Sequence, residues 1–203
     1  MRVIKKIFAS KIQKSLPYIL IIGAVIGLFA SLTLTVEHID LIKDPGHQLS
    51  CSLDPVLSCG PVINSKQAEA FGFPNPLVGL AVFGAQLMLG IVMLAGGRMK
   101  SWFWKFYMAG MIAGVAFTFW LMFETLYRIS ALCIYCMSVW TVMFATIWYV
   151  FQYMLAEKHL KLNKKFTGFV RKHHFDILLA WFVIVAALIL NHFWYYYGPK
   201  LGF

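Results

Sequence analysis

The stretch CIYCMSVWTVMFATIWYVFQYMLA, residues 133–156, begins with two cysteines three residues apart and continues as a long apolar run. A helix rises about 1.5 Å per residue, so about twenty residues cross the roughly 30 Å of hydrocarbon in a bilayer. The whole chain is 61% hydrophobic and only 13% charged. A soluble domain of 203 residues cannot bury so much apolar surface, so the composition favours a protein that has lipid as its solvent.

Four further apolar runs have a similar length. Together the five runs predict membrane-spanning helices at about 16–36, 77–95, 106–127, 134–156 and 176–197. They lack the two-residue alternation of a membrane β-barrel. No soluble linker or internal repeat separates them, so we expect one membrane domain over residues 1–203. The predicted fold is all-α, with a bundle of four helices and a fifth membrane helix.

The formal charge of +10 is concentrated on alternate connections between the runs. Fourteen of the 18 basic residues lie there: Arg2, Lys5, Lys6, Lys11, Lys14, Arg98, Lys100, Lys105, Lys158, Lys161, Lys164, Lys165, Arg171 and Lys172. Basic loops stay in the cytoplasm, so the pattern predicts a multi-pass protein of the inner or plasma membrane. Its N-terminus would be cytoplasmic and its C-terminus extracytoplasmic. Short basic loops beside membrane spans do not favour nucleic-acid binding.

One long connection, residues 37–76, joins the first two runs on the predicted outer side. It contains Cys51 and Cys59, and loops of such length are usually functional. The segment GPVINSKQAEAFGF, residues 60–73, has a proline where a first helical turn tolerates it. We therefore expect a short helix at the membrane surface that begins beside Cys59 and ends near Gly72.

All four cysteines fall on the predicted outer side: Cys51 and Cys59 in the long loop, Cys133 and Cys136 at the start of the fourth span. This asymmetry suits an oxidising compartment. Two structural disulfides would explain the even number, and four thiolates are also a legitimate zinc set. However, the seven residues between Cys51 and Cys59 fit a zinc knuckle poorly, and no histidine stands next to either pair. We therefore expect no metal.

A redox relay is the third interpretation. Cysteines at positions i and i+3 lie on nearly one face of a helix, and the positive helix N-terminus favours the reactive thiolate. Cys133 would face the aqueous edge, while Cys136, one turn deeper, would face the interior of the bundle. A structural disulfide does not need this arrangement, but the transfer of electrons from soluble thiols to a lipid-soluble acceptor does. Nearby, Glu124 and Arg128 have the spacing of an ion pair at the outer edge.

Three stretches, SCSLDPVLSCGPV (50–62), FGFPNPLVG (71–79) and LYRISALCIYC (126–136), resemble the bacterial homologues of vitamin K epoxide reductase. The similarity is to the actinobacterial type, which has no fused thioredoxin domain, and it covers about residues 14–155. The resemblance implies a four-helix bundle around a quinone such as menaquinone or a related, vitamin K-like molecule. It also implies an extracytoplasmic loop that carries a shuttle pair of cysteines.

By this resemblance, Cys51 receives electrons from a thioredoxin-like extracytoplasmic partner of the DsbA type. Cys59 then exchanges with Cys133, and Cys136 contacts the quinone ring. Asn75, in the Pro-Asn-Pro turn, matches an asparagine that hydrogen-bonds a quinone carbonyl.

Two further positions follow from the same resemblance. Ser65 matches a hydroxyl near the quinone. Trp140 stands where vertebrate members have a tyrosine, and its indole N–H can also donate, with a different reach.

The function implied is a quinone-dependent thiol oxidoreductase. It would reoxidise the soluble partner at the expense of the membrane quinone pool and so support disulfide formation. Reduction of vitamin K quinone or its epoxide as the main role is an alternative. A membrane scaffold without catalytic activity, stapled by disulfides, is another.

Overall fold

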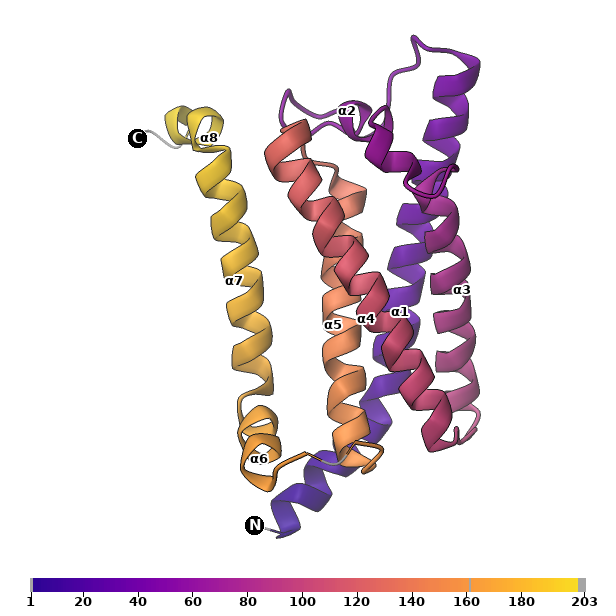
Figure 1. Cartoon of the computed structure of the whole chain (residues 1–203), viewed down its shortest axis with the longest axis vertical. Helices are drawn as coiled ribbons and strands as arrows, with labels where there is room; N and C mark the ends of the chain where they lie inside the picture. Colours follow the sequence, from indigo (N-terminus) through magenta and orange to yellow (C-terminus); the bar gives the residue numbers. More distant parts are fainter. Residues whose placement is uncertain (1, 161, 201–203) are drawn as a thin grey trace.

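The structure, a computed structural model, describes residues 2–160 and 162–200 and is built from helices (Figure 1). No strand occurs among these residues, although one isolated parallel bridge does. The longer helices are α1 (Arg2–Lys43), α3 (Asn75–Leu94), α4 (Ser101–Glu124), α5 (Ile134–Ala156), α6 (Lys164–Lys172) and α7 (His174–His192). The short ones are α2 (Gly60–Ile63), the 3₁₀ turn η1 (Lys66–Glu69), the π-helical turn η2 (Thr125–Ile129) and α8 (Trp194–Lys200).

Five helices in the described part of the chain are long and apolar enough to cross a membrane, which confirms the predicted all-α membrane fold. They cover Lys11–Lys43, Asn75–Leu94, Ser101–Ile129, Ile134–Ala156 and His174–His192. Large apolar side chains point outward from them, for example Phe106 and Ile22. Because exposed apolar side chains are costly in water, this surface is one that lipid covers. The chain is a multi-pass membrane protein.

Helices α1, α3, α4 and α5 form a bundle, and α7 stands beside it (Figure 1). Helix α1 packs against both α3 and α5, and α4 packs against α5. At the end of the bundle nearest the N-terminus, the core contains Leu16 and Leu20 of α1 with Trp104 and Met154. The bundle is therefore closed at this end by large side chains.

The fifth span ends earlier than the predicted 176–197, because the chain turns at Phe193 before α8 begins. Phe193 is fully buried against Val56, Leu132 and other side chains at the far end of the bundle. Midway along α7, the Trp181 ring stacks on Phe144 of α5 with centroids 3.9 Å apart. These two contacts attach α7 to the bundle while most of its surface stays exposed.

The single helix expected over 60–73 is wrong in its extent. It begins beside Cys59 as expected, but α2 stops at Ile63, and Ser65 has an extended backbone with ψ 149°. The Ser65 hydroxyl donates to the Val62 carbonyl at 2.7 Å and so competes with the helical pattern. The chain restarts as η1 and turns at Gly72, whose φ of +79° favours glycine. The result places η1 across one end of the bundle.

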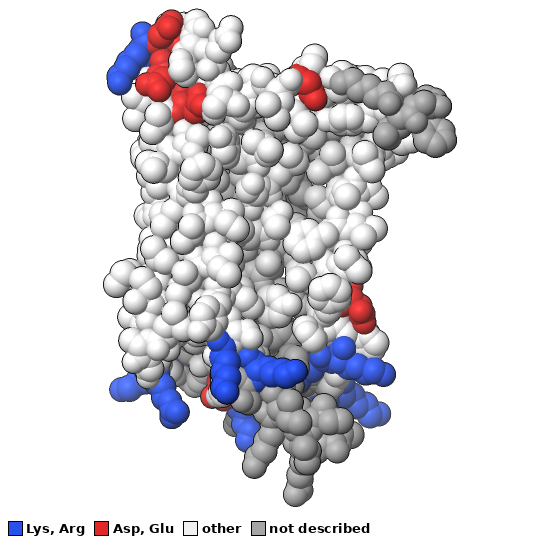
Figure 2. All heavy atoms as spheres, turned by 180° about the vertical axis from the view of Figure 1, so that it is seen from behind, with Lys and Arg blue, Asp and Glu red and all other residues white. Residues whose placement is uncertain are grey.

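Charge is distributed unevenly between the two ends of the molecule (Figure 2). Lys and Arg gather at the end that contains Lys14, Arg98 and Lys105, which we call the basic end. Most of the acidic residues in this view lie at the opposite end (Figure 2). That opposite end carries Cys51, Cys59, Cys133 and Cys136, and we call it the cysteine end.

Gly27 allows α1 to approach α3 closely. A Cβ atom at this position would lie 2.5 Å from ring atoms of the buried Phe83. We expect Gly27→Ala to lower the free energy of unfolding by about 1–3 kcal/mol, because overpacking forces the ring and backbone to shift. Thermal unfolding in detergent measures the effect. The control is Gly84→Ala on α3, where a Cβ meets nothing within 4 Å; equal destabilisation by both variants would contradict the close approach.

Candidate thiol–disulfide centre and cavity

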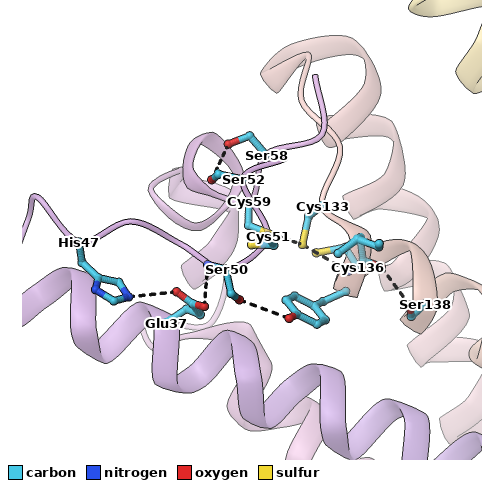
Figure 3. Close-up of a disulfide and its surroundings, with 12 residues drawn as sticks. Glu37, His47, Ser50, Cys51, Ser52, Ser58, Cys59, Cys133, Cys136 and Ser138 are labelled. Atoms are coloured by element: carbon cyan, nitrogen blue, oxygen red, sulfur yellow. Dashed lines mark hydrogen bonds and ion pairs between the residues drawn. A yellow bond between two sulfur atoms is a disulfide. The ribbon is translucent and has the colours of Figure 1, made fainter. Parts of the chain in front are cut away.

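Both cysteine pairs meet at the cysteine end of the bundle (Figure 3). Cys51 and Cys59 form a disulfide, and Cys133 and Cys136 are free thiols. Cys59 and Cys133 are fully buried, while Cys51 is 3% exposed. The Sγ atoms of Cys59 and Cys133 lie 3.1 Å apart. A sulfur at this distance from a disulfide is placed for thiol–disulfide exchange, which proceeds by thiolate attack on a disulfide sulfur.

A short pairing between two loops holds Cys59 beside Cys133. Leu57 and Leu132 form a parallel bridge, and the Leu132 N–H donates to the Val56 carbonyl at 2.7 Å. The turn that leads into this pairing is fixed by Asp54, whose Oδ1 accepts from the backbone N–H groups of the next loop residues at 2.8 Å. Because Cys133 follows Leu132 directly and Cys59 follows Leu57 by two residues, the backbone pairing brings the two sulfurs close together.

Cys133 is the N-cap residue of α5, and its sulfur accepts a hydrogen bond from the Cys136 backbone N–H at 3.4 Å. The Cys136 thiol, together with backbone N–H groups, lowers the pKa of the Cys133 thiol. A lower pKa increases the fraction of thiolate, which is the species that attacks a disulfide. The hydrogen bonds at the start of α5 therefore favour the thiolate form of Cys133.

The other side of the disulfide is anchored to α1 (Figure 3). The Ser50 backbone N–H donates to Glu37 Oε1 at 3.0 Å, and His47 Nε2 lies 3.4 Å from Glu37 Oε2. The Ser50 hydroxyl lies 3.4 Å from the hydroxyl of Tyr135. Tyr135 belongs to the first turn of α5 and stands between Cys133 and Cys136 in the sequence. These contacts tie the residue next to Cys51 to two membrane helices, so the loop is held on both sides of its disulfide.

A cavity of about 180 Å³ lies beside the centre and is lined by residues of α1, α3, α4, α5 and the loop that contains η1. Its walls are largely apolar. The polar or titratable side chains that line it are Ser31, His38, Ser65, Gln67, Asn75, Thr118, Glu124, Thr125, Cys136 and Trp140. A largely apolar cavity with a few polar groups is typical of a site for a small apolar molecule.

Four residues singled out in the sequence line this cavity: Ser65, Asn75, Cys136 and Trp140. Both the oxygen and the nitrogen of the Asn75 side-chain amide form hydrogen bonds within the protein. Its Nδ2 donates to the Gln67 carbonyl at 2.7 Å, and its Oδ1 accepts from the Ala70 N–H at 3.1 Å. An amide nitrogen carries two protons, so one N–H of Asn75 is left for a ligand.

Ser65 and Trp140 differ in what they can offer to a ligand. The Ser65 proton is used in the bond to Val62, which leaves its oxygen as an acceptor. Trp140 is 4% exposed and packs against Leu132 and Phe193 as well as lining the cavity. Its indole ring therefore forms a wall that α7 supports from behind.

Six polar groups of the cavity were not expected there from the sequence: Ser31, His38, Gln67, Thr118, Glu124 and Thr125. Glu124 pairs with Arg128 at 3.4 Å, as its spacing predicts, but it is buried and also accepts from Gln67 Nε2 at 2.9 Å. His38 Nε2 lies 3.3 Å from Glu69 Oε1. For His38 and Glu124, the signal in the sequence was an ionisable residue in or beside a membrane span, where such groups often mark a functional site.

The structure and the comparisons together assign the class of protein. The described residues contain no group of three or more His, Cys, Asp or Glu side chains that could hold a metal ion. What they do contain is a helical membrane bundle in which a thiol–disulfide centre borders an apolar cavity. The model of the vitamin K epoxide reductase family matches residues 18–151, more than half of the chain. The chain belongs to this family, which confirms the resemblance.

No curated protein matches the chain. The family nevertheless supports an oxidoreductase of membranes, either a quinone-linked thiol oxidoreductase or a vitamin K reductase in general. Quinones are associated with the family as a whole.

Proposed function

We propose that this protein oxidises the dithiol of an extracytoplasmic, thioredoxin-like partner and passes the electrons to a membrane quinone. The observation that carries this proposal is the 3.1 Å distance between the Cys59 and Cys133 sulfurs, with Cys136 of the same pair lining the cavity. The centre thus connects a disulfide in a surface loop with an apolar site inside the membrane. A scaffold stapled by disulfides has no use for free thiols at such a place.

The order of the steps follows the positions of the four sulfurs. A partner thiolate attacks Cys51, the cysteine of the loop disulfide that is not fully buried, and releases Cys59 as a thiolate. The second partner thiol completes the partner's own disulfide and frees Cys51 as a thiolate. The Cys59 thiolate attacks Cys133 of an oxidised Cys133–Cys136 pair, forms a Cys59–Cys133 bond and releases Cys136. Attack of the Cys51 thiolate on Cys59 then restores the loop disulfide and releases Cys133, so that Cys133 and Cys136 are both reduced. Cys136 then delivers two electrons to the quinone as the Cys133–Cys136 disulfide forms again. A lower pKa makes Cys133 a good leaving group when Cys51 restores the loop disulfide.

The fit of the cavity to a quinone supports the last step. A quinone ring is flat and apolar with two carbonyl oxygens, and the walls offer apolar side chains with a few donors. The free N–H of Asn75 would donate to one carbonyl as negative charge develops there. Menaquinone or a related molecule matches this chemistry.

The orientation of the chain belongs to the same proposal. The basic end faces the cytoplasm by the positive-inside rule, so the cysteine end and the C-terminus face the extracytoplasmic space. That side is where disulfides persist and where a thioredoxin-like oxidant works.

The Cys59→Ala variant tests the partner step. We expect its Cys51 thiol to capture a DsbA-type protein that has one cysteine, activated as its thionitrobenzoate mixed disulfide. The complex should persist, because Cys59 is the residue that would resolve it. Non-reducing electrophoresis and mass spectrometry identify the linkage.

Cys51→Ala is the matched control and should give little complex. Equal capture by both variants would contradict the role of Cys51.

An assay of the wild-type enzyme with quinone and quinone epoxide tests the acceptor. An epoxide turned over as fast as the quinone would favour vitamin K recycling as the main role.

A further inference from the structure

Reduction of a quinone consumes protons as well as electrons. The two thiols of Cys133 and Cys136 lose two electrons and two protons when they form a disulfide, and the two ring oxygens gain the same number. Cys136 lines the cavity, so its proton can pass directly to one oxygen. The Cys133 thiol is fully buried in the cluster of loop cysteines and gives up its proton when it becomes a thiolate. One proton must therefore return to the cavity by another route.

The cavity wall offers few groups for this purpose. Among the described residues that line it, the titratable side chains besides Cys136 are His38 and Glu124. Both oxygens of Glu124 serve as acceptors, one toward Gln67 and one beside the Arg128 guanidinium. His38 is the remaining candidate, and imidazole is the side chain that most readily takes up and releases a proton near neutral pH.

His38 also has a connection to water. Its side chain is 13% exposed, and its Nε2 lies 3.3 Å from Oε1 of Glu69. The Glu69 side chain is 49% exposed. A carboxylate that reaches solvent can pass a proton to an imidazole, and the two ring nitrogens allow uptake on one side and release on the other.

Resting on the function proposed above, we propose that His38 is the general acid that delivers the second proton to the quinone and regains it from the extracytoplasmic water through Glu69. In the balanced reaction, Cys133 and Cys136 form a disulfide and give two electrons to the ring. One ring oxygen takes the proton of Cys136, and the other takes a proton from His38. The proton that Cys133 released to water equals the one that Glu69 and His38 return.

His38→Gln in the full-length protein tests this role, with a short-chain quinone and a reduced dithiol partner. Glutamine keeps a polar contact with Glu69 but cannot carry a proton. We expect kcat to fall about 10²-fold, within the usual contribution of a general acid, with KM for the quinone unchanged. Added imidazole should restore part of the rate.

Three comparisons make the test specific. His173→Gln removes a histidine that contacts a carboxylate, Asp176 at 2.8 Å, outside the cavity, and should leave the rate unchanged. Glu69→Gln keeps the imidazole and should slow the reaction less than His38→Gln does. The exchange between Cys59 and Cys133, followed by thiol labelling, should stay at the wild-type rate in both variants.

The outcomes separate the two proposals. A wild-type protein that reduces no quinone overturns the proposed function and the role of His38 with it. An active wild type with an unchanged rate in His38→Gln overturns the role of His38 alone. So does a loss of rate that His173→Gln shares, or one that imidazole does not relieve and that comes with a weaker KM.

Discussion

Cys136→Ser is expected to reduce quinone reduction to the uncatalysed rate. Cys136 is the sulfur of the four that lines the cavity, so its removal leaves electrons no path from the loop cysteines to the quinone. A serine hydroxyl has nearly the same shape but does not form a disulfide or give up electrons. The loss is measured as quinone absorbance change with a reduced dithiol partner in detergent or liposomes.

The same variant should accumulate a new disulfide. The Cys133 thiolate lies 3.1 Å from the Cys59 sulfur and has lost the thiol that would resolve the exchange. It should therefore attack the loop disulfide, form a Cys59–Cys133 bond and release Cys51 as a free thiol. Proteolysis under non-reducing conditions followed by mass spectrometry identifies this linkage.

Ser138→Ala is the control for Cys136→Ser. Ser138 lies two residues further along α5 and its hydroxyl bonds the Ile134 carbonyl, away from the sulfurs. This variant should keep the activity and the loop disulfide. If Cys136→Ser still reduces quinone, electrons do not pass through Cys136, and a scaffold with structural disulfides is favoured.

Asn75→Asp is expected to lower kcat for quinone reduction by about 10²–10³, the usual cost of losing one donor to a developing oxyanion. The aspartate has the same shape, but it cannot donate to a carbonyl oxygen and places a negative charge where the ring gains one. It also loses the donor to the Gln67 carbonyl, which helps to hold η1 over the cavity. Steady-state kinetics over a range of quinone concentrations measures both kcat and KM.

Asn64→Asp provides the matched control, because it adds the same charge between α2 and η1 at an exposed position outside the cavity wall. It should leave kcat unchanged. If Asn75→Asp instead lowers the thermal unfolding temperature while kcat stays at the wild-type value, Asn75 serves to hold the loop and does not act on the quinone.

Local sequence patterns predict the structure well where a single physical requirement dominates. The span predicted at 134–156 coincides with α5, because crossing a bilayer demands an unbroken apolar helix of that length. The ion pair of Glu124 with Arg128 follows from helical spacing. The segment 60–73 is less predictable, since the bond from the Ser65 hydroxyl to the Val62 carbonyl divides it after one turn. A short polar loop at a membrane surface is governed by such individual contacts, which periodicity does not record.

The cavity shows the same limit at the level of function. A family resemblance in short motifs predicted Asn75, Ser65 and Trp140. No motif in the sequence points to His38 or Gln67. His38 reaches the cavity because α1 continues beyond the predicted span end at residue 36, and Gln67 reaches it because η1 folds back across the bundle. Both placements depend on contacts between segments that are far apart in the chain.

The sequence by itself therefore determined that this is a membrane protein, that its fold is all-α and that two cysteine pairs lie at one end. These properties follow from hydrophobicity, helix length and charge asymmetry, which are local or additive along the chain. Only the tertiary structure decided that Cys59 and Cys133, 74 residues apart, lie within exchange distance and that Cys136 lines a largely apolar cavity. The physical reason is that the pairing of Leu57 with Leu132 and the packing of four helices bring these groups together.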